Sequence, residues 1–358
     1  MTERETQIFK WIKENPMISQ QEIADRANIT RSSAAVHISN LMKKGMIRGK
    51  GYVLQEENYS TVVGAVNVDI SGTPNQKLVN ADSNPGKMTI SFGGVGRNIA
   101  ENISRLGGQV EMITVLGDDF YAAEIEKSCR TLGIQLQHTL RVACENTSTY
   151  LCINDNKGDM EVAINDMSIY EKLTPEYLED KMAIINKGRQ VIIDANIPEE
   201  TIKYLADKAT VPILAEPVST KKAMKFASVL DKIFLLKPNQ LELELLSGIT
   251  IENEKELQRA MDVLLDRGVK HLMVSMGSQG VYYGSIKGKM HYPCLPCQVV
   301  NTTGCGDALM GAMAWGMQNE ESVSQAITYG LAAASICIEH QGAISQELTA
   351  KNLLKRLN

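Results

Sequence analysis

The chain has 358 residues, 44% of them hydrophobic, which is enough for a sizeable core and typical of two or three domains. Aromatic residues make up only 5%, which argues against a stacking surface for long single-stranded nucleic acid. The net charge of −5 is uneven: residues 1–55 carry nine Lys and Arg against five acidic residues, a net of +4, so the remainder carries −9 and two separate functions are indicated.

Residues 1–55 have the pattern of three short helices followed by a hairpin. Capping boxes at residues 2–5 and 19–22 open the first two helices, and Thr30 caps the third. Residues 45–54 alternate and carry three glycines, as a small hairpin would. This order resembles a winged helix-turn-helix.

That resemblance implies DNA contacts from the recognition helix and its flanks, at Arg31, Ser32, Ser33, His37, Lys43, Lys44, Arg48 and Lys50. The alternative is a small helical appendage used for dimerisation or packing. Because the charge of this region is modest, tight DNA binding is expected to need a dimer.

A short polar joint at residues 56–59 precedes an apolar strand predicted at residues 61–66. Asn67 and Asp69 follow it, at the position where open α/β sheets bind ligands. Because they stand two residues apart in a strand, their side chains point the same way, and both are suited to binding one polyol. The alternative is an Asx-turn that closes the strand.

Residues 70–91 predict a flap or a few strands, because they contain Pro74 and Pro85 and no helical period. The glycines that follow, at 93, 94 and 96, let the backbone approach a ligand closely. Asn98 stands in the first turn of the helix expected at residues 99–106. The glycine spacing excludes a dinucleotide-binding GxGxxG fingerprint.

The middle of the chain alternates between strands and helices. Strands are predicted at residues 110–116, 147–154, 161–164, 190–193, 211–215, 233–236 and 271–275, with helices between them, including 122–132 and about 174–185. This alternation predicts a mostly parallel sheet covered by helices on both faces. Polar residues follow the strands and are expected to gather along one edge of the sheet.

Residues 301–312 form a glycine-rich turn between a strand predicted at residues 297–300 and an apolar helix predicted at residues 308–315. Exposed amides at a helix N-terminus make an anion site. Asp307 is unexpected there, because a carboxylate beside an anion site raises the local energy. It is suited to taking a proton from a hydroxyl that attacks a phosphoryl group. The alternative is an ordinary turn with Asp307 as helix cap.

The sequence shows no export or membrane signal, because its first residues are polar and no apolar run is long enough to span a bilayer. The seven cysteines are scattered, with one CxxC at Cys294 and Cys297. This usage favours thiols in a reducing cytosol over a zinc or redox site, and we expect a cytoplasmic protein.

Four motifs, in order, give the body a resemblance to the ribokinase-like (PfkB) carbohydrate and nucleoside kinases over about residues 59–357. They are Gly93-Gly94 with Asn98, Asn239-x-x-Glu242, Ser275-x-Gly277 with Gly280, and Thr303-Gly304-Cys305-Gly306-Asp307. The resemblance implies an α/β fold with a mostly parallel sheet, helices on both faces and a small β lid at about residues 70–91 and 147–165. The expected domains are a winged helix-turn-helix at 1–57 and a kinase at 58–358.

The resemblance also implies catalytic roles. Asp307 is then the general base, and the amides of Gly304, Cys305 and Gly306 form the anion hole. Asn239 and Glu242 act through water on Mg²⁺ and the phosphates, although both also fit a helix start with a first-turn acid. ATP lies along Ser275, Gly277 and Gly280. No Walker-type lysine is recognisable, so neutralising the phosphate charge is assigned to metal and backbone dipoles.

The sugar site implied by the resemblance consists of Asn67, Asp69, Gly93, Gly94, Asn98 and Asn196. In many relatives the lid also forms a dimer contact, and a homodimer is expected. Thr147-Ser148-Thr149-Tyr150 and the run from Val162 to Pro175 look most like pseudouridine kinases and related nucleoside kinases with a helix-turn-helix head. Thr149 and Asn165 are then candidate contacts to the base or ribose; for Asn165 and Asp166 the alternative is a strand-end turn.

Two residues depart from the family pattern. Asn301 replaces an Asp that, with the Thr303 carbonyl and backbone near Gly342, commonly helps to hold a monovalent cation, so K⁺ activation is in doubt. Cys305 replaces a small Ala and places a thiol at a helix N-terminus, where its pKa should fall. Oxidative inactivation is the resulting hypothesis.

The sequence thus predicts an ATP- and Mg²⁺-dependent kinase for the 5′-hydroxyl of a ribonucleoside, with pseudouridine the first candidate, and a DNA-binding head. Inosine, uridine, adenosine, ribose and fructose are the alternative substrates. A transcription regulator whose kinase-like body only senses a sugar or nucleoside is the alternative of another class.

Overall fold

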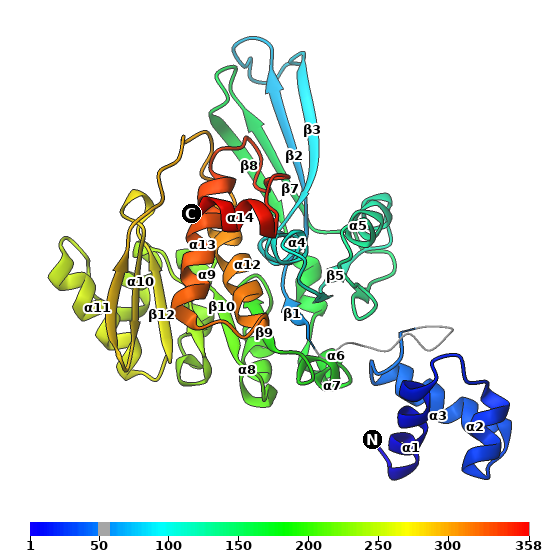
Figure 1. Ribbon diagram of the computed structural model, residues 1–358. Coiled ribbons are helices and arrows are strands. Elements are labelled where there is room, and N and C mark those ends of the chain that lie inside the picture. Colours follow the sequence, from blue (N-terminus) through cyan, green and yellow to red (C-terminus); the bar gives the residue numbers. More distant parts are fainter. Residues whose placement is uncertain (49–57, 358) are drawn as a thin grey trace.

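The computed structural model describes residues 1–48 and 58–357, which we call the head and the body (Figure 1). The head contains the helices α1 (Glu3–Glu14), α2 (Gln20–Ala27) and α3 (Arg31–Lys43). Thr2, Ser19 and Thr30 each accept a hydrogen bond from the backbone amide three residues on, so the predicted caps are confirmed. Most of the predicted hairpin at 45–54, including Lys50, lies outside the described residues.

The body is built around a large sheet with strand order β14-β13-β12-β11-β10-β9-β1-β4. The pairs from β4 to β12 are parallel and the last two are antiparallel. The strands are β1 (Ser60–Val63), β4 (Val110–Ile113), β9 (Gln190–Asp194), β10 (Ile213–Glu216), β11 (Leu235–Leu236), β12 (His271–Ser275), β13 (Val281–Ser285) and β14 (Gly288–Tyr292). The predicted mostly parallel sheet is confirmed.

Helices cover both faces of this sheet, as its strand residues show. Val62 packs into one apolar cluster and Val63 into another, and Ile192 and Ile193 divide in the same way. One face is covered by α4 (Val95–Arg105), α5 (Phe120–Thr131), α12 (Cys305–Gln318) and α13 (Val323–Cys337). Residues on the other face pack with α6 (Pro175–Glu179), α7 (Met182–Ile185), α8 (Glu199–Lys208), α9 (Thr220–Ala223), α10 (Gln240–Ser247) and α11 (Glu254–Asp266). The last helix is α14 (Ala350–Arg356), which packs on α13.

A second sheet rises from the body and forms the predicted lid (Figure 1). Its order is β3-β2-β7-β8, from β2 (Asn67–Pro74), β3 (Gly86–Gly93), β7 (Thr149–Asn154) and β8 (Met160–Asp166). We call it the lid sheet. The strands β5 (Val115–Leu116) and β6 (Leu140–Arg141) form a separate two-stranded sheet.

Three predicted elements differ from the structure. The strand predicted at 297–300 is absent, because Pro296 directly precedes this segment and Val300 instead donates its amide to the Ile338 carbonyl at the end of α13. The helix predicted at 174–185 is divided into α6 and α7. The first strand ends at Val63, and Asn67 begins a lid strand.

The head touches the body through Phe9 of α1 and through Met46 and Arg48 near its last described residue. Arg48 pairs with the buried Glu111 of β4 at 2.6 Å. Lys187 lies near the sulfur of Met46 and over the ring of Phe9, whose centroid is 5.3 Å from its ammonium. Two charged side chains of the body, Glu111 and Lys187, therefore contact the head.

Within residues 1–48 and 58–357, every helix is too short or too polar to serve as a membrane span.

Candidate active site

The glycine-rich turn begins α12 at the carboxyl edge of the large sheet. Gly304 is its N-cap, with φ of 80°, and a β-carbon there would lie 2.0 Å from the Ala343 carbonyl oxygen. Only glycine fits both the conformation and the space. The amides of Gly306 and Asp307 fall in the first helical turn, where intrahelical acceptors are lacking, while that of Cys305 donates to the Thr302 carbonyl at 3.3 Å.

Asp307 occupies the third position of α12 rather than its cap. Its Oδ2 accepts a hydrogen bond from Asn98 Nδ2 at 2.8 Å, across 209 residues of sequence. Desolvation raises the pKa of Asp307 to about 6, against the Asn98 hydrogen bond and the charge of Lys237, which both lower it. A carboxylate with this pKa is charged at neutral pH and basic enough to take a proton.

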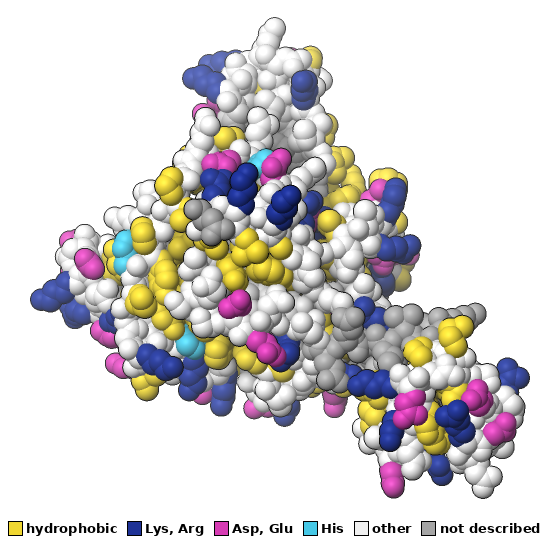
Figure 2. All heavy atoms as spheres, viewed as in Figure 1, with side chains coloured by type: hydrophobic (Ala, Val, Ile, Leu, Met, Phe, Trp, Pro, Cys, Tyr) yellow, Lys and Arg dark blue, Asp and Glu magenta, His cyan; other side chains and the backbone are white. Residues whose placement is uncertain are grey.

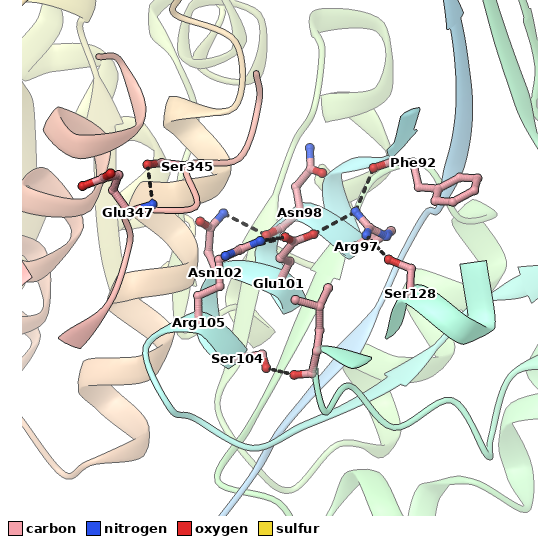
Figure 3. Close-up of polar contacts among 11 residues, drawn as sticks. Phe92, Arg97, Asn98, Glu101, Asn102, Ser104, Arg105, Ser128, Ser345 and Glu347 are labelled. Atoms are coloured by element: carbon pink, nitrogen blue, oxygen red, sulfur yellow. Dashed lines mark hydrogen bonds and ion pairs between the residues drawn. The ribbon is translucent and has the colours of Figure 1, made fainter. Parts of the chain in front are cut away.

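Helix α4 holds Asn98 in place through a buried polar network (Figure 3). Arg97 donates to the Phe92 carbonyl at 2.7 Å and to Ser128 Oγ at 3.0 Å, and it pairs with Glu101 at 3.0 Å. Asn102 donates to the Asn98 carbonyl at 2.8 Å. These contacts hold the backbone at Asn98, and its side chain is held by the hydrogen bond to Asp307.

Asp69 lies across from the start of α4. Its Oδ2 is 2.0 Å from where a β-carbon of Gly93 would stand, so only glycine leaves room for the carboxylate. Burial raises the pKa of Asp69 to about 6, and the Arg97 charge opposes this rise. Asn67, in the same strand, accepts from Ser148 Oγ at 2.7 Å.

The structure brings together most of the predicted sugar-site residues: Asn67, Asp69, Gly93, Gly94 and Asn98. Asn196 instead accepts a hydrogen bond from Lys222 at 2.5 Å, beside the buried Asp194. Its side chain is therefore already engaged with a lysine.

The two candidate lid contacts lie on opposite faces of the lid sheet. In the strand register Asp69 stands beside Tyr150, which stands opposite Asn165, so these three share one face. Thr149 stands opposite Asp166 on the other face and lines a hollow with Tyr121. Asn165 thus lies on the same face as Asp69, and Thr149 does not.

The residues predicted to lie along ATP gather at the ends of β11 and β12. Asn239 and Glu242 form a reciprocal capping box at the start of α10, with both bonds at 2.9 Å. The backbone of Asn239 also forms an isolated parallel β-bridge with that of Ser275. Gly277 has φ of 56° and open space where a side chain would be. Asn239 and Glu242 therefore do form a helix start, as the alternative interpretation predicted. The capping box uses only one of the two carboxylate oxygens of Glu242.

Sequence reasoning overlooked Lys237. It directly follows β11 and is paired with Glu216 of β10 at 2.8 Å, with its ammonium against the first turn of α12. A signal was present: opposite charges follow two consecutive buried strands, at Ala215-Glu216 and Leu236-Lys237.

The residues that depart from the family pattern are tied to neighbouring loops. Asn301 accepts from the Thr303 amide at 3.0 Å and donates to the Gln341 carbonyl. Cys305 is hydrogen-bonded to Cys337, which lowers the pKa of the Cys305 thiol, whereas burial and the charge of Asp307 raise it. Cys337 lies 3.4 Å from the Ala343 carbonyl oxygen.

In the head, some of the predicted DNA contacts lie on α3 and others are engaged in ion pairs. Arg31, Ser32 and Lys43 are exposed on α3, and Ser33 and His37 are half-buried on the same helix. Lys44 is paired with Glu5 at 2.7 Å, and Arg48 with Glu111. Figure 2 shows that Lys and Arg side chains are interspersed with acidic ones on the visible face of the head.

Comparison with known proteins agrees with this geometry. Residues 57–350 match the model of the pfkB family of carbohydrate kinases. The chain belongs to this family. Residues 1–48 match a winged helix-turn-helix DNA-binding model, so the head resembles what the sequence predicted.

Two curated relatives are each 34% identical to the chain. One is the uncharacterised sugar kinase YeiI of Escherichia coli, matched over 99% of this chain and 98% of its own length. The other is the pseudouridine kinase of E. coli, matched over 84% of this chain and 97% of its own length.

Solved structures share the fold of the body. An Arabidopsis thaliana ribokinase complexed with ribose and ATP is 25% identical, with a TM-score of 0.74 over 84% of this chain and 98% of its own. A ribokinase-like protein of E. coli in complex with ATP and Mg²⁺, 19% identical, has a TM-score of 0.72 over 84% and 98%. The chain is therefore a sugar or nucleoside kinase of the pfkB family, which transfers a phosphoryl group to an alcohol.

The two desolvated carboxylates predict the pH dependence of the free enzyme. Asp307 must be charged to accept a proton, and the pKa values of Asp307 and Asp69 are both raised to about 6. We expect kcat/KM for the acceptor to fall as the pH drops below about 6, with a limiting slope approaching two. Asp69→Asn removes one of the two groups and should reduce the slope to about one, at a lower plateau. An acid limb near pH 4 in the wild type would contradict this prediction.

The thiol of Cys305 predicts sensitivity to oxidants. Because its pKa is lowered by Cys337, the reactive thiolate is more populated than in an ordinary cysteine. We expect peroxide to inactivate the kinase and a dithiol to restore it, whereas Cys305→Ala should be inactivated about tenfold more slowly at equal ATP. Cys144→Ala, at an exposed site away from α12, is the matched control. Full activity of the wild type after peroxide treatment would refute the idea.

Proposed function

We propose that the protein is an ATP- and Mg²⁺-dependent kinase that phosphorylates the 5′-hydroxyl of a ribonucleoside, with pseudouridine as the first candidate. The observation that carries this proposal is a pair of carboxylates, one in the lid strand β2 and one at the start of α12. Asp307 is held by Asn98 beside unpaired helix amides, and Asp69 is held in a lid strand beside Gly93.

The chemistry follows from these positions. Asp69 accepts hydrogen bonds from two neighbouring hydroxyls of a ribose, which orients the ring and brings its primary hydroxyl to Asp307. Asp307 takes the proton of that hydroxyl as its oxygen attacks the γ-phosphorus of ATP. The amides of Gly306 and Asp307 face the charge that develops on the phosphoryl oxygens.

The donor set near α10 fits a magnesium ion held largely through water and phosphate. Glu242 is 2% exposed and spends one oxygen on the Asn239 amide. Its other oxygen and the Asn239 side chain are hard oxygen donors of the kind Mg²⁺ prefers. When bound there, the ion would supply positive charge to the phosphates.

Similarity to the pseudouridine kinase of E. coli supports a nucleoside acceptor, and the sugar kinase YeiI, which matches nearly the whole chain, leaves a free sugar open. Asn165, on the face of the lid sheet shared with Asp69, is the candidate contact to the base. Inosine, uridine, adenosine, ribose and fructose are the alternative acceptors. Activation by K⁺ stays a prediction, since the Asn301 side chain already bonds the Thr303 amide and the Gln341 carbonyl.

The deciding experiment is ATP consumption by the purified protein with Mg²⁺ across pseudouridine, uridine, inosine, adenosine, ribose and fructose. We expect turnover with pseudouridine and none with the free sugars. Asp307→Asn should lower kcat by roughly 10²- to 10⁴-fold while ligand binding, measured by calorimetry, is retained.

Two outcomes would redirect the proposal. Turnover with a free sugar alone would replace the nucleoside as substrate. Thermal stabilisation by one ligand without any turnover would favour a sensor, in which the body reports a sugar or nucleoside to the head.

We further propose that the head, taken as residues 1–57 and followed by the kinase at 58–358, binds DNA as part of a homodimer. The winged helix-turn-helix match and the exposed Arg31, Ser32 and Lys43 support DNA binding. For the dimer, the support is an apolar face of the lid sheet on the side away from Asp69. Met88, Ile90, Val162 and Ile164 are 54% to 70% exposed there, a patch that a second copy would cover.

This proposal predicts coupled changes in assembly and DNA affinity. Ile164→Asp should shift the protein from dimer to monomer in sedimentation velocity and weaken binding to its operator DNA about tenfold or more, because two heads no longer bind together. Arg31→Ala should weaken DNA binding without changing the assembly. A wild-type monomer, or DNA affinity unaffected by both variants, would contradict the proposal.

A further inference from the structure

Lys237 and Glu216 form a buried ion pair at the carboxyl edge of the large sheet. Glu216 ends β10 and Lys237 follows β11, and the register of Ala215 with Leu236 makes them neighbours. The Nζ–Oε2 distance is 2.8 Å, and the two side chains are only 5% and 8% exposed. Burying such a pair costs desolvation that an apolar pair of equal volume would avoid, so stability alone is a weak reason for it.

The ammonium of Lys237 points at the anion hole. A β-carbon built on Gly306 has Lys237 Nζ as its nearest neighbour, at 3.3 Å. A cation at a helix N-terminus is disfavoured by the helix dipole, so nothing in α12 itself calls for a lysine here. An anionic group placed between the helix amides and the ammonium would satisfy both at once.

The charges that face Lys237 keep it protonated. Burial alone would lower the pKa of Lys237, but the carboxylates of Glu216, Glu242 and Asp307 outweigh it and raise the pKa overall. A lysine that never loses its proton cannot serve as the base. It can serve as a fixed positive charge beside the phosphates. The sequence analysis identified no lysine for this role.

We infer that Lys237 is a catalytic residue that binds the transferring γ-phosphoryl group of ATP, with Glu216 as the positioning residue that holds the ammonium in reach. This inference rests on the kinase activity but not on the identity of the acceptor. In the step, the acceptor oxygen forms a bond to the γ-phosphorus while the bond from that phosphorus to the bridging oxygen of ADP breaks. The hydroxyl proton passes to Asp307, and Lys237 stays protonated beside the phosphoryl oxygens.

The test separates a catalytic lysine from a structural one. Lys237→Met should lower kcat about 100-fold or more, while nucleoside affinity measured without ATP changes less than about twofold. It should weaken a non-hydrolysable ATP analogue clearly more than ADP, because only the analogue carries the γ-phosphoryl group. Lys237→Arg should recover part of kcat.

Two further variants keep the test decisive. Glu216→Leu combined with Lys237→Met leaves no unpaired charge and should fold; it is expected to be as inactive as the single variant. Lys225→Met removes a half-buried lysine that instead bonds the Ala195 and Ile197 carbonyls, and it should keep wild-type kcat.

A folded double variant with kcat within about threefold of wild type would overturn the inference and leave the pair as a link between β10 and β11. Equal losses of affinity for the ATP analogue and for ADP would also overturn it. Because the nucleotide-binding measurement needs no acceptor, it stays informative even if the proposed nucleoside proves wrong.

Discussion

Burial of charge at the carboxyl edge of the large sheet is the constraint around which this molecule is arranged. Asp194, Glu216, Lys237 and Glu242 are each at most 6% exposed. A buried charge is tolerated only with a partner. Asp194, Glu216 and Lys237 each have a partner from another element, and Glu242 is paired with the cap of its own helix. Asp194 accepts the amides of Ala65 and Asn196, Glu242 that of Asn239, and Glu216 and Lys237 hold each other. Strand ends and helix starts are therefore locked together where the substrates meet.

Helix α4 acts on both carboxylates of the proposed mechanism, Asp307 and Asp69. Through Asn98 it donates to Asp307, and through the charge of Arg97 it opposes the desolvation of Asp69. The same Arg97 is tied to Glu101, which also pairs with Arg105 at 2.7 Å (Figure 3). One buried network thus places a hydrogen-bond donor on Asp307, the proposed base, and a positive charge near Asp69, the proposed sugar ligand.

Much of this arrangement was predictable because the signals are local. Caps at Thr2, Ser19 and Thr30 define the helices of the head, and alternation of buried strands with helices defines the body. Order along the chain was enough to place Asp307 at a helix start. The predictions that failed depend on distant contacts. Residues 297–300 are apolar like a strand, but the Val300 and Asn301 amides bond the Ile338 carbonyl at the end of α13.

The precise contacts of the site lay beyond the sequence for the same reason. The bond between Asn98 and Asp307 joins residues 209 apart, and the pairing of Glu216 with Lys237 depends on which strands are neighbours. Strand register also decides that Asn165 and Thr149 face opposite ways, which a one-residue shift would reverse.

The placement of Asp69 within β2 has a thermodynamic consequence. Only three residues separate β1 from β2, and Asp69 belongs to the lid sheet although it serves the sugar site. Any movement of the lid sheet would therefore carry the carboxylate with it and change its distance from the sugar that it is proposed to bind. Under the proposed function, sugar binding and the position of the lid sheet would then be coupled through the contacts of the sugar hydroxyls with Asp69.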